Sequence, residues 1–237
     1  MENPRILLFG ATGAVGGEVL KTLLALPQVA KVTAIGRRKA DIPAGLDPSH
    51  KLVQETADLN DPAAYSRYLK GHSHAICTLG VGQPSKMSRD EFVRIDRDLV
   101  LTLARACREA GVAGFSLLGA LGANAHSSFF YPKLKGQLEE GLKGLGFERL
   151  RLFRPSMILT PTNRYGSLQG FLLRFWPLLN PVLVGSLSKA RGIRVEELGR
   201  VMALSAVIDD DPGVKILYWA DFKDLIRNNG DAGSKGV

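Results

Sequence analysis

The sequence predicts an α/β fold built on a doubly wound parallel sheet. A short apolar run, residues 5–9, ends at the glycine-rich stretch 10–16, as a buried strand does when it enters a tight turn. Apolar residues then recur at helical spacing between Val15 and Leu24, so strand, turn and helix follow one another without a gap. Further short apolar runs alternate with helical patterns up to about residue 155, and this alternation requires parallel strands joined by right-handed crossovers.

The composition fits one domain large enough to bury a full core. The chain has 237 residues, of which 45% are hydrophobic and 23% are charged. Cys77 and Cys107 provide neither a disulfide framework nor a metal-ligand spacing, and we expect both to be small core residues. The histidines are scattered and predict no metal site, and we expect His72 and His74 in a loop that leads into a strand.

The net charge of +8 does not by itself identify a partner. The basic residues are dispersed and no nucleic-acid-binding motif is present, so a nucleic acid is not the favoured partner, whereas a phosphorylated cofactor also suits a basic surface. The first apolar run is too short for a signal peptide, and two prolines and Arg174 interrupt the apolar stretch 171–184. We therefore expect no membrane span and a cytoplasmic location.

The glycine-rich stretch is a candidate phosphate-binding turn. Glycines allow the sharp turn, let backbone N–H groups approach a pyrophosphate and let the helix pack closely on the strand. The N-terminus of the following helix adds unpaired N–H donors and a partial positive charge. The spacing therefore predicts an NAD(P)-binding Rossmann fold, with a turn that binds no ligand as the alternative. The residues expected to contact the cofactor here are Gly10, Thr12, Gly13, Ala14, Val15 and Gly16.

The end of the second expected strand predicts which nicotinamide cofactor binds. Residues 31–35 form this strand, and Gly36, Arg37 and Arg38 follow it. Proteins that prefer NAD usually place an acidic residue at this point, where it binds the ribose hydroxyls. Two arginines instead suit the 2′-phosphate of NADP through charge-assisted hydrogen bonds. We therefore expect NADP rather than NAD, with two solvated loop arginines as the alternative.

Two further turns follow expected strands at the same edge of the sheet. Residues 51–55 form the third strand, and the next helix is expected to have Asp61 as its N-cap and Pro62 as its first residue. The fourth strand begins at His74 and ends at small residues, which let the backbone approach the cofactor. The candidate cofactor contacts at these two turns are Asp58, Leu59, Thr78, Leu79 and Gly80.

The later elements continue the alternation. A long helix is expected to begin at Ser88, which forms a capping-box pattern with Glu91, and to end at Gly111. Strands are then expected at residues 112–118, 147–153 and 214–219, and helices at 130–145, 193–207 and 221–227. Because the pattern changes after residue 155, we divide the chain into a dinucleotide-binding core, residues 1–155, and a C-terminal substrate lobe, residues 156–237, that is integrated with the core.

Tyr131 and Lys135 form the candidate catalytic pair. They are four residues apart in an expected helix and therefore lie on one face. A nearby ammonium favours the phenolate, so we expect Lys135 to lower the pKa of the tyrosine. A tyrosine tuned in this way can donate or accept the proton that accompanies hydride transfer at a carbonyl or alcohol. The same lysine is expected to bind the nicotinamide ribose.

Several segments together carry a resemblance to a known family. They are residues 10–16, 35–38, 77–80 and 92–98, the pair Tyr131 and Lys135, and residues 153–155. Through them the chain resembles the Tat-interacting-protein oxidoreductase branch of the atypical short-chain dehydrogenase/reductases, adjacent to the NmrA-like proteins, over most of residues 5–160. The resemblance implies that Asp58 contacts the adenine amino group and that Pro155 belongs to the cofactor site. A purely turn-stabilising role for Asp58 is the alternative.

The chain departs from this family after the fifth expected strand. Members usually carry a serine there that hydrogen-bonds the reacting oxygen, and this chain has Gly119 and Ala120 instead. Ser116 precedes this position, and Ser127 and Ser128 follow it. If no other group substitutes, losing one donor lowers the rate by a factor on the order of 10²–10³.

Two functions therefore stay open. One is an NADP-dependent oxidoreductase acting on an apolar carbonyl or alcohol, and the other is a catalytically silent NADP-binding redox sensor or regulatory protein. The apolar segment 171–179 is expected to pack against the core, to line a pocket for a small apolar ligand, or to form a homodimer contact.

Overall fold

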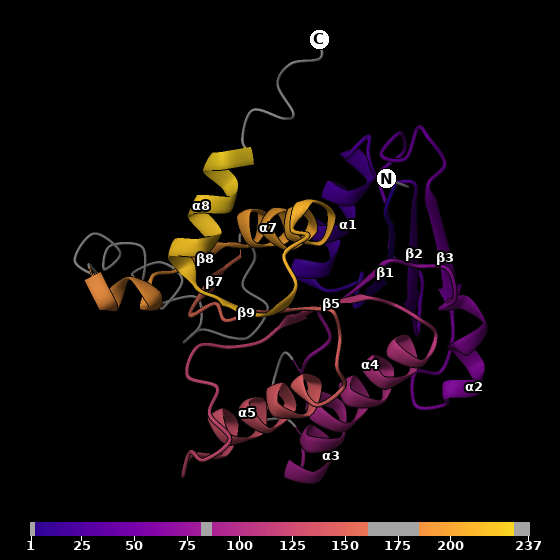
Figure 1. Cartoon of the computed structure of the whole chain (residues 1–237). Coiled ribbons are helices and arrows are strands. Elements are labelled where there is room, and N and C mark those ends of the chain that lie inside the picture. Colours follow the sequence, from indigo (N-terminus) through magenta and orange to yellow (C-terminus); the bar gives the residue numbers. More distant parts are fainter. Residues whose placement is uncertain (1–2, 82–86, 161–184, 230–237) are drawn as a thin grey trace.

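Seven parallel strands form the central sheet of the molecule (Figure 1). The computed structural model describes residues 3–81, 87–160 and 185–229. The strands are β1 (Arg5–Phe9), β2 (Lys31–Gly36), β3 (Leu52–Thr56), β4 (His74–Cys77), β5 (Gly114–Leu118), β6 (Arg149–Phe153) and β9 (Gly213–Leu217). Their order is β3-β2-β1-β4-β5-β6-β9. β2 and β3 are therefore added on one side of β1, and the later strands are added on the other side, beginning with β4. This confirms the predicted doubly wound Rossmann sheet.

Helices cover both faces of the sheet. They are α1 (Ala14–Ala25), α2 (Pro62–Tyr65), α3 (Arg89–Val93), α4 (Val100–Glu109), α5 (Phe130–Lys143), α7 (Val195–Ile208) and α8 (Trp219–Asn229), with the 3-10 turns η1 (Ser66–Tyr68) and η4 (Gly185–Ala190). In Figure 1, α1, α7 and α8 lie on one side of the sheet, and α3, α4 and α5 lie on the other. The central strands β1, β2, β4 and β5 are buried between the two layers, which explains their largely apolar sequences, whereas the edge strands β3 and β9 are only partly buried.

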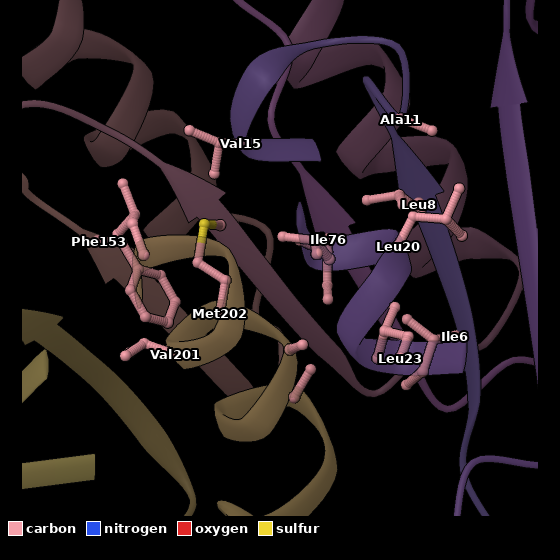
Figure 2. Close-up of a cluster of buried hydrophobic side chains, with 14 of the residues drawn as sticks. Ile6, Leu8, Ala11, Val15, Leu20, Leu23, Ile76, Phe153, Val201 and Met202 are labelled. Carbon is pink, nitrogen blue, oxygen red and sulfur yellow. The ribbon is translucent and has the colours of Figure 1, made fainter. Parts of the chain in front are cut away.

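The core on the α1 side joins the N-terminal and C-terminal parts of the chain. Figure 2 shows Ile76 of the sheet between Leu20 of α1 and Met202 of α7, with Leu8 beside Leu20. The two helices approach closely at Gly199, where a Cβ would lie 2.9 Å from the backbone of α1. A second core of buried residues lies under α4 and α5 on the opposite face.

The C-terminal third adds to this same sheet. β9 pairs with β6 in parallel, and α7 packs along α1. A separate two-stranded sheet is formed by β7 (Ile158–Leu159) and β8 (Ile193–Arg194) directly after β6 and before α7. The apolar segment 171–179, for which the sequence suggested packing, a pocket or a dimer contact, lies outside the described residues.

The helix expected between Ser88 and Gly111 is not one continuous α-helix. Both ends are as predicted, because the Ser88 hydroxyl accepts a hydrogen bond from the Glu91 amide at 3.2 Å and Gly111 has a φ of +88°. Between them, however, a π-helical segment, η3 (Arg94–Leu99), separates α3 from α4. A π-helical turn contains more residues than an α-helical turn, and the local sequence pattern does not reveal it.

The two histidines near the start of β4 are both buried. The Nε2 atom of His74 lies 2.8 Å from the hydroxyl of Ser116 inside the sheet, and burial lowers the pKa of His74 to about 3. His72 lies between Thr33 and the Leu69 carbonyl, before the strand. His72 therefore lies in the loop before β4, as predicted, whereas His74 is the first residue of β4 itself. Cys77 and Cys107 are buried and free, as predicted.

Candidate functional site

The glycine turn between β1 and α1 is closed by a short hydrogen bond and by the end of β4. The Gly13 amide donates to the Gly10 carbonyl at 2.9 Å, and Gly10 has a φ of +92°. A Cβ at Gly16 would lie 2.1 Å from the Gly10 carbonyl oxygen, so only glycine lets α1 begin against the turn. The Thr78 hydroxyl lies 3.1 Å from the Phe9 carbonyl and 3.2 Å from that of Gly10, to which it donates. These contacts fix the geometry that the sequence predicted.

A first cavity, of about 380 Å³, lies between the glycine turn and the end of β2. Arg37 and Arg38, the residues predicted to bind a 2′-phosphate, both line it. The full lining is Gly10, Ala11, Thr12, Ala34, Ile35, Gly36, Arg37, Arg38, Gln54, Leu59 and Leu79. Among these, Gln54 on β3 is a residue that sequence reasoning missed, because it lies within the third strand and no motif marks it.

Asp58 stabilises a turn next to this cavity and does not line it. Its carboxylate accepts hydrogen bonds from the backbone amide of Asn60 at 2.9 Å and from the Asn60 side chain at 2.8 Å. These bonds lower the pKa of Asp58, whose side chain is exposed. The arrangement matches the turn-stabilising alternative, whereas the neighbouring Leu59 is buried and contacts the cavity.

A second cavity, of about 410 Å³, lies on the other side of the glycine turn. Its lining is Gly13, Ala14, Val15, Thr78, Leu79, Gly80, Val81, Asp96, Leu118, Gly119, Tyr131, Lys135, Ser156, Met157, Ile158 and Thr160. Leu79 lines both cavities, so together they form a continuous surface along the carboxyl ends of the strands. Ligands bind at this edge in open α/β sheets.

Besides Asp58, two further predicted cofactor residues line neither cavity. Gly16 supports the turn from within α1. Pro155 is buried, and its carbonyl accepts a hydrogen bond from the Leu121 amide at 2.9 Å, which joins the loops after β5 and β6. The residues immediately after it, Ser156 and Met157, line the second cavity instead.

Lys135 forms a buried ion pair with a residue that sequence reasoning missed. Its Nζ atom lies 2.5 Å from Oδ2 of Asp96 in η3, and the two side chains are 6% and 2% exposed. A signal for Asp96 was present in the sequence, because a charged residue there interrupts the apolar face formed by Phe92, Leu99 and Leu103.

Tyr131 lies beside this pair, where Nζ of Lys135 is 5.7 Å from the centre of its ring. Burial raises the pKa of Tyr131; the Lys135 ammonium lowers it by less, and the Asp96 carboxylate raises it again. The pKa therefore lies above its ordinary value. The prediction that Lys135 brings the pKa below that value was wrong, because desolvation of the phenol outweighs the effect of the ammonium and the Asp96 carboxylate adds a smaller upward effect.

None of the three serines near Gly119 in the sequence lines the second cavity. Ser116 is fully buried against His74, and the Ser127 hydroxyl accepts a hydrogen bond from the Phe129 amide. Gly119 itself donates its amide to the Phe153 carbonyl at 2.8 Å. Ser156 reaches the cavity from the neighbouring strand end, because β5 and β6 pair in register up to Leu118 and Phe153.

Fold and site together define a Rossmann-type dinucleotide-binding protein. Residues 10–144 match the model of a family described as NAD(P)H-binding. The chain belongs to this family, in the atypical short-chain dehydrogenase/reductase branch that the sequence motifs indicated.

Two curated relatives illustrate the similarity. Protein HTATIP2 of Rattus norvegicus is 36% identical over 159 residues, which cover 67% of this chain and 64% of that protein. Protein fmp52, mitochondrial, of Aspergillus clavatus is 35% identical over 157 residues, which cover 65% of this chain and 66% of that protein. The chain thus spans slightly less than two thirds of the length of these relatives.

Solved structures share the fold at low sequence identity. MoeE5 in complex with UDP-glucose and NAD has a TM-score of 0.67 and 18% identity, with 97% of this chain and 82% of that chain covered. A UDP-N-acetylglucosamine 4-epimerase from Methanobrevibacter ruminantium M1 in complex with UDP-N-acetylmuramic acid has a TM-score of 0.66 and 15% identity, with 100% and 84% covered. Within residues 3–81, 87–160 and 185–229, no helix is long and apolar enough to cross a membrane.

Proposed function

We propose that the chain is an NADP-dependent oxidoreductase that acts on a carbonyl or alcohol group of an apolar small molecule. The observation that carries the proposal is the pair of cavities on the two sides of the glycine turn. One contains two arginines, and the other contains a tyrosine beside a buried lysine. NADP has a ribose 2′-phosphate at its adenosine end and a reactive nicotinamide at the other end. The arginines of the first cavity suit the phosphate, and the tyrosine and lysine of the second cavity suit the nicotinamide.

The residues present fit the cofactor. Gly10 and Thr12 line the first cavity and Gly13 lines the second, so the backbone of the turn borders the space that a pyrophosphate would occupy. Arg37 and Arg38 are suited to a 2′-phosphate, because a guanidinium binds phosphate oxygens through two parallel hydrogen bonds. When bound, the cofactor supplies or accepts a hydride in the second cavity.

Tyr131 would then move the proton that balances the hydride. Because its pKa lies above the ordinary value, Tyr131 is a neutral phenol near pH 7 and can donate a hydrogen bond and then its proton to a carbonyl oxygen. Lys135 lies one helical turn away with its ammonium at the cavity surface, where it can hold a ribose hydroxyl. Val15, Leu118 and Met157 make the remaining wall apolar, which favours an apolar substrate.

Ser156 is the hydroxyl that we propose in place of the usual serine. Gly119 and Ala120 have no side-chain donor, and the cavity residue across the β5–β6 junction is Ser156. A second donor at the reacting oxygen stabilises the charge that develops there.

A redox sensor without catalysis is the second candidate. It is favoured by the missing hydroxyl at Gly119 and Ala120 and by the neutralisation of Lys135 by Asp96. Oxidation of NADPH in the presence of apolar aldehydes, ketones and quinones separates the two, with cofactor binding measured in parallel. Turnover of any of these substrates supports the oxidoreductase, and tight binding of NADPH without turnover across the panel supports the sensor.

A further inference from the structure

The two arginines of the first cavity lie on a short loop, residues 37–39, that is fixed at both ends. The loop consists of three consecutive cations, all of them exposed. It begins after Gly36, whose carbonyl accepts a hydrogen bond from the Ala57 amide at 3.0 Å where the pairing of β2 with β3 ends. It ends at Ala40, which is half-buried and packs against the core on the α1 side. The position of Ala40 therefore decides where the loop lies.

The side chain of Gln54 on β3 fixes Ala40. Its Oε1 atom accepts a hydrogen bond from the Ala40 amide at 2.7 Å, and its Nε2 atom donates to the Ala40 carbonyl at 3.2 Å. One side-chain amide thus pairs with both the donor and the acceptor of a single backbone residue. Gln54 is in register with Ala34 of β2, and both residues line the first cavity. The hydrogen bonds therefore join the far end of the loop to the strand that forms the cavity wall.

The charges of the loop work against a single conformation. Within residues 3–81, 87–160 and 185–229, no carboxylate forms an ion pair with any of the three cations. Their mutual repulsion and the freedom of their long side chains favour many conformations of the loop. After Ala40, the next residues that pack against the core are Ile42 and Leu46. Without the two hydrogen bonds of Gln54, a longer stretch would be free to move away from the cavity.

We infer that Gln54 is a positioning residue that determines the preference for NADP, because it holds the loop of Arg37 and Arg38 at the wall of the first cavity. The inference rests on the proposed function, in which these arginines bind the 2′-phosphate. A loop that is fixed before the cofactor arrives loses less conformational freedom on binding, and this raises the affinity. NADH has no 2′-phosphate and makes no such contact with the arginines. Only the affinity for NADPH should therefore depend on Gln54.

Gln54→Met tests the inference, because methionine has a similar length and volume but no amide. The affinity for NADPH should fall about tenfold, and the affinity for NADH should stay within about twofold, when both cofactors are titrated by fluorescence. Gln28→Met is the matched control, since Gln28 is also half-buried but lies in the turn between α1 and β2, outside both cavities. An unchanged ratio of the two affinities in a folded Gln54→Met would overturn the inference.

A double-mutant cycle separates positioning of the loop from direct contact with the cofactor. Gln54→Met is combined with the replacement of both Arg37 and Arg38 by alanine. If Gln54 acts through the arginines, its replacement should not change the ratio of affinities further once they are absent. An equal loss in both backgrounds would show that Gln54 itself binds the phosphate, and the inference would be rejected.

Limited digestion with trypsin reports on the loop without any cofactor. Trypsin cleaves after arginine and lysine, so residues 37–39 offer consecutive sites. Cleavage at these sites should be about tenfold faster in Gln54→Met than in Gln28→Met, because a loop released from Ala40 opens more often. Equal cleavage rates in the two variants would contradict a loop held by Gln54.

A measurement on the unaltered protein covers the case in which Gln54→Met does not fold. The Ala40 amide should be protected from hydrogen exchange at least about tenfold more than the amide of the exposed Lys39, because it donates to Gln54. Comparable protection of the two amides would overturn the inference.

The two cofactors also separate this inference from the proposed function. If the unaltered protein prefers NADPH and Gln54→Met keeps that preference, only the inference fails. If the unaltered protein binds NADPH and NADH equally, the NADP part of the proposed function fails, and the role of Gln54 in selectivity fails with it.

Discussion

Arg37 and Arg38 are the residues on which we propose that the choice between NADP and NAD depends. Both line the first cavity at the end of β2, where no acidic side chain is present among the residues that line it. Replacing them with alanine should remove the preference for NADPH over NADH, at a cost of about 1.5–3 kcal/mol for each lost charge-assisted contact, or roughly tenfold or more in affinity. Titration of both cofactors by fluorescence measures this.

Arg105→Ala is the matched control for the arginines, because Arg105 is exposed on α4 and lies outside both cavities. It changes the net charge by one, as each single replacement of Arg37 or Arg38 does, and should leave the preference intact. Equal affinities for NADPH and NADH in the unaltered protein would contradict the assignment.

Ser156 is the residue that we propose supplies the hydroxyl of the family serine, which is absent at Gly119 and Ala120. A substitution at Ser156 tests this role. Ser156→Ala should lower the turnover number by about 10²-fold, because it removes a donor at the reacting oxygen, and should leave NADPH affinity nearly unchanged. Ser66→Ala, at an exposed serine between α2 and η1, is the control. Full turnover in Ser156→Ala would show that another group supplies this hydrogen bond.

A serine at Gly119, where the family usually carries one, is limited by the space around its Cβ rather than by the backbone conformation of the residue. A Cβ at Gly119 would lie 3.1 Å from the Phe153 carbonyl and 3.2 Å from the Glu139 carboxylate, which is itself paired with Arg154. Gly119→Ser therefore requires its neighbours to move. Ala120→Ser already has a Cβ and is the cleaner way to add a donor.

At the scale of elements, the start of α1 depends on one glycine. Gly16→Ala would place a Cβ 2.1 Å from the Gly10 carbonyl, so the turn must open and cofactor affinity should fall at least tenfold. Gly17→Ala lies one residue further along the same helix, where the nearest atom to a new Cβ is at 3.7 Å. This control should bind normally and gain up to about 1 kcal/mol in stability from the better helix former. Thermal unfolding with and without NADPH distinguishes the two.

The elements that the sequence predicted correctly are those with a strong local signal. All strand and helix boundaries tied to apolar runs, caps or glycines agree within two residues, as at Asp61, whose carboxylate accepts a hydrogen bond from the Ala63 amide. The π-helical segment could not be predicted, because the apolar residues between Phe92 and Ala104 also fit a continuous α-helix.

The residues that line the cavities could be predicted from the sequence only where they lie close together in one segment of the chain. The glycine turn, the two arginines and the pair Tyr131 and Lys135 were found by their spacing along the chain. Gln54 and Ser156 were not, because they reach the cavities through pairing of strands that are far apart in sequence.

At the scale of the whole molecule, a buried arginine joins the sheet to the C-terminal helices. Arg151 of β6 is fully buried and donates from Nε and Nη2 to Asp209, the residue that ends α7, at 2.7 and 2.9 Å. Burial raises the pKa of Asp209, but the hydrogen bonds from Arg151 and Lys215 outweigh it and hold the pKa below its ordinary value. The pair therefore stabilises the fold only while Asp209 is ionised.

Asp209→Asn should lower the free energy of unfolding at pH 7 by an amount on the order of 3 kcal/mol, because Arg151 loses its counter-ion. The carboxylate has a lowered pKa in the folded state, so its contribution is present above the unfolded pKa, near 4, and is lost as the pH falls through the folded value. Urea unfolding at pH 7 and pH 3 should therefore show a smaller difference between variant and unaltered protein at pH 3. Asp210→Asn, at an exposed carboxylate that pairs with Arg149, is the control. A difference that does not shrink in acid would rule out this pair as the cause.

The central claim is that Tyr131 transfers a proton in a site built for NADPH. The most direct measurement is the rate of NADPH oxidation with a reactive apolar carbonyl, for the unaltered protein and for Tyr131→Phe, with NADPH affinity measured on the same samples. We expect turnover in the unaltered protein, a loss of at least about 10²-fold in Tyr131→Phe, and nearly equal affinities, because the phenol hydroxyl acts on the substrate and not on the cofactor phosphates. Equal turnover in the two proteins, or no turnover in the unaltered protein despite tight binding of NADPH, would contradict the claim.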